Sequence, residues 1–326
     1  MTIASEITRI NNNIASAYTA CNNKGATMPQ TRDSANLATC IGSISAGGGS
    51  GDSITREVVN GVYQMPVSSF TFSLPSTATR IGTQAMYYAF YGCNGITSAD
   101  LSSLTDLSDG GAMQYAFYNC AGLTSVDLSS LTSISGINTI ANAFEHCSNL
   151  TSVNLNNLTS IYSGTTPMLQ TFKNCVKLTS ISLSSLATVS VDSALYEAFY
   201  GCTELTSVDL SGLTTVDRSS ALRSTFSNCP NLTSINLTNL SVISGSHTFQ
   251  QTFRNCTSLT SLSFPSLNSN SFGSYTDQFN NMLQGVTGCT VHFPSNLQSV
   301  IGSWSDVTAG FGGTNTTILY DLPATT

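Results

Sequence analysis

Charged residues are scarce in this chain of 326 residues: only 8% are Asp, Glu, Lys or Arg, against about 25% in typical soluble domains. The few charges sum to -7 at pH 7. A chain with this balance has no basic surface with which to hold phosphate groups, so we expect neither nucleic acid nor an anionic membrane surface as a partner. Ser, Thr and Asn take the places that charged residues usually fill.

Long apolar runs are also lacking. No stretch of about 18 apolar residues occurs, so the sequence predicts no membrane insertion. The first residues, MTIASEITRINNN, contain neither a basic n-region nor a continuous apolar h-region, and we expect no secretory signal peptide in them. Action outside a cell would then require another route of export.

Motifs for catalysis and metal binding are missing as well. No phosphate-binding loop, HExxH motif, CxxC pair or Cys/His nucleophile arrangement occurs. GDSI (51–54) resembles the nucleophile block of GDSL-type esterases, but no histidine has the Asp three residues before it, so we interpret GDSI as part of a linker. TDLSDGG (105–111) lacks the closing glutamate of a calcium loop and is interpreted as a loop. We predict a protein that is not an enzyme and that needs no cofactor or metal.

What the chain has in abundance is a repeat, of which residues 113–131, MQYAFYNCAGLTSVDLSSL, are one copy. Successive copies are offset by 27, 27, 28, 27, 27 and 27 residues, as shown by their phenylalanines: Phe90, Phe117, Phe144, Phe172, Phe199, Phe226 and Phe253. A cysteine follows three residues after each Phe, and Leu-Thr-Ser or Ile-Thr-Ser begins six residues after it. A fixed period of about 20 to 50 residues predicts a solenoid, whose turns bury their faces against one another.

Two hydrophobic periods alternate within one copy. The apolar residues of MQYAFYNC (113–120) are spaced i, i+3, i+4 and i+7, which predicts a short helix, and LTSVDL (123–128) predicts a short strand. The predicted fold class is therefore α/β, with a short helix and a strand in each turn. Strand ends from Leu74 to Phe293 give about nine turns, which would stack to a length of roughly 40 Å at about 4.8 Å per strand.

Seven of the ten cysteines occupy the same repeat position, on the predicted buried face. An odd number of stacked thiols cannot pair completely, and buried thiols behave as small apolar side chains. We therefore expect a reduced cysteine ladder, from Cys93 to Cys256, with Cys21, Cys40 and Cys289 outside it.

The repeat resembles the leucine-rich repeat, and specifically its BspA-like variant with AFxxCxxLxxIxLPxxLxxIG units, which occurs in bacterial surface proteins. The resemblance covers roughly residues 70–295 and is closest in SLPSTATRIG (73–82) and VHFP (291–294), which keep the proline after the strand. The middle copies replace that proline and run longer between strand and helix. The resemblance implies a leucine-rich-repeat solenoid and, as one possible function, an adhesin that binds a host matrix protein.

The first 44 residues follow another pattern. Ile3, Ile7, Ile10 and Ile14 step by four and three residues, as the core positions of a coiled coil do, and Ile at both core positions favours three or more strands. We predict a homotrimer held by this helical segment; the alternative is a single helix that docks on another protein. The stretch 17–44 resembles the leader of phage and prophage tail proteins of Gram-positive gut bacteria, which implies other tail proteins as partners.

These patterns divide the chain into five segments. They are an N-terminal helical attachment or oligomerisation segment (1–44), a Gly/Ser linker (45–53), an N-terminal cap with the first turn (54–84), the repeats (85–267), and the last turns with a C-terminal cap (268–326).

Outward positions of the predicted helices change from copy to copy while the core positions stay fixed, as in a recognition surface. Tyrosine recurs there and gives a large contact area for little lost entropy. The candidate binding residues on this face are Tyr87, Tyr88, Tyr91, Tyr115, Tyr118, Tyr196 and Tyr200. The alternative is that exposed positions vary freely.

A second candidate surface is the outward face of the strands, where short polar side chains repeat. Its candidate residues are Asp100, Asp127, Asn154, Asp209 and Asn236. They could hydrogen-bond sugar hydroxyls or hold a cation, or they could simply keep an exposed sheet soluble.

The sequence thus predicts a non-catalytic binding protein. The leading hypothesis is a phage or prophage tail component, located in the virion, that recognises a bacterial surface glycan or protein receptor through the solenoid. The alternatives are a BspA-like adhesin on the bacterial cell surface and a structural spacer.

Overall fold

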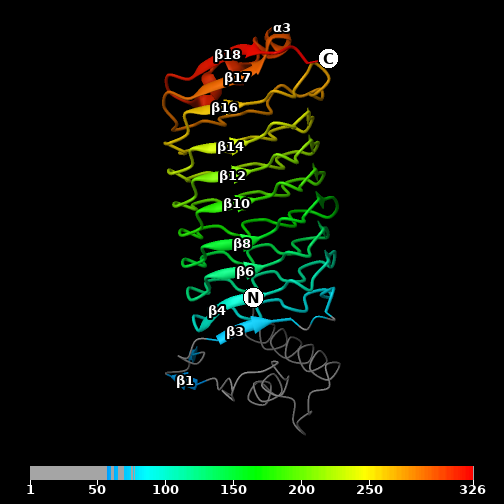
Figure 1. Cartoon of the computed structure of the whole chain (residues 1–326), viewed down its shortest axis with the longest axis vertical. Coiled ribbons are helices and arrows are strands. Elements are labelled where there is room, and N and C mark those ends of the chain that lie inside the picture. Colours follow the sequence, from blue (N-terminus) through cyan, green and yellow to red (C-terminus); the bar gives the residue numbers. More distant parts are fainter. Residues whose placement is uncertain (1–56, 60–61, 65–69, 75, 77, 326) are drawn as a thin grey trace, which may run out of the picture.

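The computed structural model describes residues 57–59, 62–64, 70–74, 76 and 78–325. These residues form a column of stacked turns, with β3 near one end and β18 at the other (Figure 1). The predicted N-terminal helix with Ile3, Ile7, Ile10 and Ile14, the linker and the GDSI motif all lie outside the described residues. The column begins beside a short antiparallel hairpin of β1 (Glu57–Val59) and β2 (Val62–Gln64).

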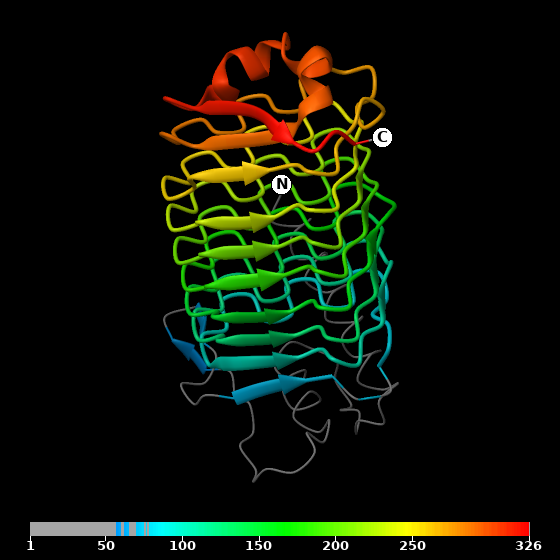
Figure 2. The same cartoon turned by 45° about the horizontal axis from the view of Figure 1, so that its top comes forward.

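The main strands run parallel, one above another, along one side of the column (Figure 2). They are β3 (Phe70–Ser73), β4 (Ile96–Asp100), β6 (Ser125–Asp127), β8 (Ser152–Asn154), β10 (Ser180–Ser182), β12 (Ser207–Asp209), β14 (Ser234–Asn236), β16 (Ser261–Ser263), β17 (Thr290–Pro294) and β18 (Thr317–Leu322). Within the stack, Val126 pairs with Ala99 on one side and Val153 on the other, an offset of one repeat. The prediction of about nine turns is confirmed, and β18 adds a strand beyond Phe293, where the predicted stack ended.

A second side of the column carries a parallel sheet of two-residue strands. These are β5 (Asp106–Leu107), β7 (Ser133–Ile134), β9 (Ser160–Ile161), β11 (Thr188–Val189), β13 (Thr215–Val216) and β15 (Val242–Ile243). The second residue of each strand is buried. The sequence predicts only one strand in each turn, because two residues are too few to show a period of two.

The third side is a ribbon of consecutive β-turns, so the predicted short helices are wrong. We call it the turn ribbon; it occupies 82–93, 109–120, 136–147, 164–175, 191–202, 218–229 and 245–256. Every second amide donates to the carbonyl three residues back, as Ala116 N does to Met113 O at 2.9 Å. The amides between them donate to the next turn of the solenoid, as Phe117 N does to Ala143 O at 2.8 Å.

The turn ribbon imitates a helix in sequence because its conformation repeats every four residues. Backbone φ is positive at Gly111, Tyr115 and Asn119, and positive φ at the third residue of a turn is what a type II turn requires. A period of four cannot be told from 3.6 over two cycles, and the i, i+3, i+4, i+7 residues of MQYAFYNC (113–120) are indeed fully buried. The missed signal is the residue before each ladder cysteine, which is always one that tolerates positive φ: Gly92, Asn119, His146, Asn174, Gly201, Asn228 and Asn255.

Stacked phenylalanines and cysteines fill the core behind the turn ribbon. The seven repeat phenylalanines have neighbouring ring centroids 5.0 to 6.0 Å apart and planes within 12° of parallel. The thiol of Cys120 donates to the carbonyl of Phe90 at 2.9 Å, and the same bond recurs up to Cys256, which donates to Phe226. All eight cysteines among the described residues are buried, and those from Cys120 to Cys289 are free thiols. The ladder is therefore a row of hydrogen-bond donors as well as a row of small apolar groups.

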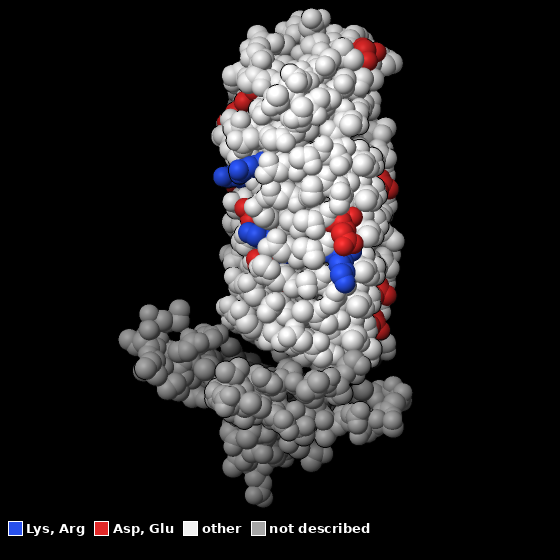
Figure 3. Space-filling model, turned by 90° about the vertical axis from the view of Figure 1, so that its left-hand side faces the viewer, with Lys and Arg blue, Asp and Glu red and all other residues white. Residues whose placement is uncertain are grey.

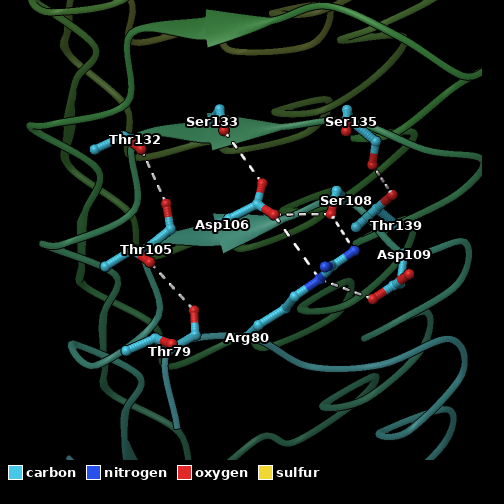
Figure 4. Close-up of polar contacts among 10 residues, drawn as sticks. All are labelled: Thr79, Arg80, Thr105, Asp106, Ser108, Asp109, Thr132, Ser133, Ser135 and Thr139. Carbon is cyan, nitrogen blue, oxygen red and sulfur yellow. Dashed lines mark hydrogen bonds and ion pairs between the residues drawn. The ribbon is translucent and has the colours of Figure 1, made fainter. Parts of the chain in front are cut away.

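Threonine hydroxyls link successive turns just before the strands of both sheets. Thr132 Oγ1 donates to the carbonyl of Thr105 at 2.9 Å, and Thr105 Oγ1 donates to Thr79 at 3.4 Å (Figure 4). Thr124 does the same to Thr97 beside the main sheet, at 2.9 Å. The same bond recurs at Thr151, Thr206 and Thr233, and it accounts for the threonine that follows Leu in these copies.

Short helices and 3-10 turns close the C-terminal end of the column (Figure 2). They are η1 (Ser295–Leu297), α3 (Gln298–Ile301), α4 (Ser305–Thr308) and η2 (Gly310–Gly312). Trp304 packs edge-on against Phe272, with ring centroids 4.9 Å apart. No helix in the described part of the chain has the length and apolarity needed to cross a membrane.

Substitutions at Asn174 distinguish the turn ribbon from a helix. Because the φ of Asn174 is 59°, Asn174→Ala should lower the free energy of unfolding by about 1 kcal/mol, since Asn tolerates positive φ better than Ala does. Asn174→Gly should change it by less than about 0.5 kcal/mol. A helix would give the opposite order, with Ala stabilising. Urea denaturation of the two variants and the wild type decides between them.

The buried thiols predict a loss of stability at alkaline pH. Burial raises the pKa of Cys147, Cys202 and Cys256 to about 12, whereas unfolded thiols ionise near 8.5. Above about pH 8.5 the unfolded chain releases protons that the folded chain keeps, so the stabilisation is complete below that pH and is lost as pH rises towards 12. Under reducing conditions the urea midpoint should fall between pH 8 and 10. A Cys147→Ala/Cys202→Ala variant should show a shallower fall, and an equal slope in both proteins would contradict this account.

Candidate functional site

Five of the seven candidate tyrosines gather on the outer face of the turn ribbon. Tyr87, Tyr88, Tyr91, Tyr115 and Tyr118 form what we call the tyrosine patch. The rings of Tyr91 and Tyr118 stack with centroids 4.8 Å apart and planes 5° apart, and Tyr88 and Tyr115 stack at 4.8 Å. Tyr87 meets Tyr88 edge-on at 4.5 Å. The 27-residue register produces these stacks, because equivalent positions of adjacent turns lie one above the other.

The patch combines exposed ring surface with protonated hydroxyls. Tyr91 is 51% exposed, and the other four rings are half-buried. Burial raises the pKa of Tyr88, Tyr115 and Tyr118, and the negative charge of Glu145 raises it further for Tyr115 and Tyr118. These hydroxyls therefore stay neutral at physiological pH and can donate hydrogen bonds to a ligand.

The other two candidates, Tyr196 and Tyr200, lie in a separate group further along the same face. Lys173 Nζ lies 2.6 Å from Glu197 Oε2 and 4.9 Å from the ring centroid of Tyr200. The guanidinium carbon of Arg223 lies 5.2 Å from the ring centroid of Tyr196. We call these five residues the cation-filled group, because the chain's own Lys and Arg contact both rings.

A line of polar side chains connects the two tyrosine groups. Asn142 Nδ2 donates to Gln170 Oε1 at 2.9 Å, and Gln170 Nε2 donates to Glu197 Oε2 at 2.8 Å. Burial pushes the pKa of Glu197 upwards, but hydrogen bonds from Lys173 and Gln170 outweigh burial and leave it below its ordinary value. Asn142, Gln170 and Glu197 were not predicted as site residues, although they occupy the same repeat position as Tyr88 and Tyr115.

On the strand face, the five predicted residues have a structural role. The side-chain oxygen of each accepts the amide two residues further on, which closes a tight turn at the strand end. The bonds are Asp100 with Ser102, Asp127 with Ser129, Asn154 with Asn156, Asp209 with Ser211 and Asn236 with Thr238, at 2.9 to 3.3 Å. The two bonds from Ser102 lower the pKa of Asp100. Asp100, Asp127 and Asn154 also line a shallow open hollow over β4, β6 and β8.

The acidic residues of TDLSDGG (105–111) are engaged by an arginine, and Asp106 belongs to strand β5 rather than to a loop. Arg80 Nε lies 3.1 Å from Asp109 Oδ2, and the Arg80 guanidinium also donates to Ser108, which donates to Asp106 (Figure 4). No three His, Cys, Asp or Glu side chains of the described ranges come together as metal ligands would. Charges are few and scattered on the face shown in Figure 3, in keeping with the low charged fraction of the sequence.

The repeat can now be assigned to a family. The profile of the BspA type leucine rich repeat region matches residues 60–166 and 168–303. This match spans most of the chain, and the chain therefore belongs to the BspA-type leucine-rich repeat family. Leucine-rich repeat proteins of this kind are typically non-catalytic binding proteins.

Several solved structures are similar to this chain. A leucine-rich repeat protein of T. pallidum is 22% identical, with 63% of this chain and 87% of that chain covered and a TM-score of 0.41. A leucine rich cell surface protein of Faecalibacterium prausnitzii is 15% identical, with coverages of 78% and 90% and a TM-score of 0.26. An internalin of Listeria monocytogenes is 16% identical, with coverages of 69% and 74% and a TM-score of 0.21. All three TM-scores are below 0.5, so these likenesses decide nothing about a ligand. A comparison with curated proteins gives no match.

The ion pair in the cation-filled group predicts a stability difference between two lysines. Lys173→Ala leaves Glu197 without its cation although the Glu197 side chain is only 16% exposed, and should lower the free energy of unfolding by about 1–2 kcal/mol. Lys177→Ala removes an exposed amine that donates a hydrogen bond to Asn149 and should change the free energy of unfolding by less than about 0.5 kcal/mol. Urea denaturation at low salt measures both. Equal effects would mean that Lys173 contributes no more than a surface charge.

Proposed function

We propose that this chain is a non-catalytic binding protein that acts at a bacterial cell surface and recognises its ligand through the tyrosine patch. The observation that carries the proposal is the contrast within the turn ribbon. Its inward positions keep the same Phe and Cys in seven turns, while its outward positions change and bring five tyrosines together in two of them. Tyrosine clusters of this kind are what protein and glycan recognition surfaces use.

Membership of the BspA-type family favours an adhesin over a phage tail component. The family match lies within residues 60–303, whereas the tail hypothesis rests on residues 1–44, which lie outside the described residues. The same holds for the predicted homotrimer, the contact with other tail proteins and the virion location, which stay predictions. We propose a location on the bacterial surface, with a host matrix protein as the partner class and a bacterial surface glycan or protein receptor as the alternative.

Removal of the patch tests the proposal. The triple variant Tyr91→Ser/Tyr115→Ser/Tyr118→Ser should lose at least tenfold in affinity for the surface that the wild type binds, because three stacked rings leave the contact area. Binding is measured against immobilised animal matrix proteins and against bacterial envelope fractions.

Two exposed tyrosines outside the patch provide the matched control. Tyr162 and Tyr275 are 50% and 47% exposed, and Tyr162→Ser/Tyr275→Ser should bind as the wild type does. A structural spacer would be indifferent to both sets of substitutions. Unchanged binding by the triple variant would therefore remove the tyrosine patch from the function.

A further inference from the structure

The cation-filled group shows which kind of chemical group the outer face of the turn ribbon accommodates. A carboxylate, Glu197, and two tyrosines hold an ammonium from Lys173 and a guanidinium from Arg223. Aromatic faces attract cations through the ring quadrupole, and a nearby carboxylate adds direct charge attraction. The same residue types, close together elsewhere on this face, should bind the same kind of group.

The tyrosine patch likewise combines tyrosine rings with a carboxylate, Glu145. Glu145 occupies the turn after Tyr118, in the same column of outward positions as Tyr91, and is 7% exposed. Its Oε2 accepts a hydrogen bond from Asn142 at 2.6 Å. Among the described residues the only basic side chain within ion-pair distance of Glu145 is His146, whose Nε2 lies 3.5 Å from Glu145 Oε1. No Lys or Arg of the described ranges contacts Tyr91, Tyr115 or Tyr118. The patch therefore keeps an anionic group that no lysine or arginine of the described chain neutralises.

Backbone carbonyls add to the negative potential at this end of the column. In later turns, the carbonyls of the turn ribbon accept amides from the turn before, as Ala116 O accepts from Phe90. The equivalent carbonyls of the first turn, including those of Tyr87, Ala89 and Tyr91, accept no hydrogen bond from any described residue. They belong to the same turn as Tyr87, Tyr88 and Tyr91, so their partial negative charges lie at the same end of the column as the patch.

From these observations we infer that the tyrosine patch binds an organic cation, and specifically the arginine side chain of a partner protein, between its rings and Glu145. Arginine suits the site better than lysine, because its planar guanidinium stacks on aromatic rings and sheds its hydration more easily. This inference rests on the proposed function and gives the chemistry of its ligand. It also predicts that the partner presents a basic segment to a protein whose own net charge is -7.

A pair of peptides tests the inference on the full-length chain. The probes are a blocked peptide with two arginines separated by glycine and the same peptide with neutral citrulline in place of arginine. The arginine peptide should bind at least fivefold more tightly than the citrulline peptide, and its affinity should fall as salt is raised. Glu145→Gln keeps an oxygen for Asn142 but removes the charge, and should weaken binding of the arginine peptide about fivefold or more. Calorimetric titration or tyrosine NMR shifts measure the affinities.

Glu204→Gln is the matched control, because it removes the same charge from an exposed position outside the patch and should leave binding unchanged. Equal binding of the two peptides to the wild type would overturn the inference whether or not the Glu145 variant folds. Equal weakening by both Gln variants, or no binding by the wild type, would also overturn it. If the triple tyrosine variant loses its surface ligand while the wild type ignores the arginine peptide, the proposed function stands and this inference falls.

Discussion

The structure depends on backbone hydrogen bonds between turns that are one repeat apart. In the turn ribbon, alternate peptide units accept from the turn before and donate to the turn after, as the unit between Ala116 and Phe117 does. These bonds fix the separation of the turns, and they can form only if each turn has nearly the same length, which is why the copies differ by at most one residue. The phenylalanine stack, the thiol ladder and the threonine ladder all follow from this spacing, since each pairs a residue with its equivalent one turn away.

The repeat, the main strands and the buried positions could be predicted because a buried slot constrains the residue type in every copy. The turn ribbon could not be told from a helix by its apolar residues, since MQYAFYNC (113–120) buries the same four residues in either conformation. Only the residue at positive φ separates them, and that slot holds residues such as Asn119 and Gly201, which are also common in loops. The two-residue strands of the second sheet are recognisable only by their pairing across turns.

The candidate site, like the fold, could be predicted only in part from the sequence. The outward position of each tyrosine follows from the repeat, and all seven candidates lie on the predicted face. Which tyrosines touch one another depends on the residue at the same position one turn away. Tyr118 and Tyr200 fall into different groups because Glu145 and Lys173 occupy that position in the two turns between them. The strand-face residues, by contrast, form local turns. A side chain such as Asp127 recurs because its oxygen accepts the backbone amide that closes the turn after each strand. Repetition alone therefore does not distinguish a binding residue from a turn-forming residue.

The alignment of peptide units in the turn ribbon has an electrical consequence. Each aligned unit carries a dipole of about 3.5 D, and the bonds from Tyr88 through Tyr115, Asn142 and Gln170 join such units head to tail along the column. The turn ribbon thus acts as a bundle of parallel macrodipoles, although the α-helices that usually carry them are nearly absent from the described residues. Its positive pole faces the C-terminal end, where the Asp306 carboxylate accepts the backbone amide of Phe279. A protein with very few charged side chains is in this way electrically polar from one end to the other, with a direction set by the direction of its chain.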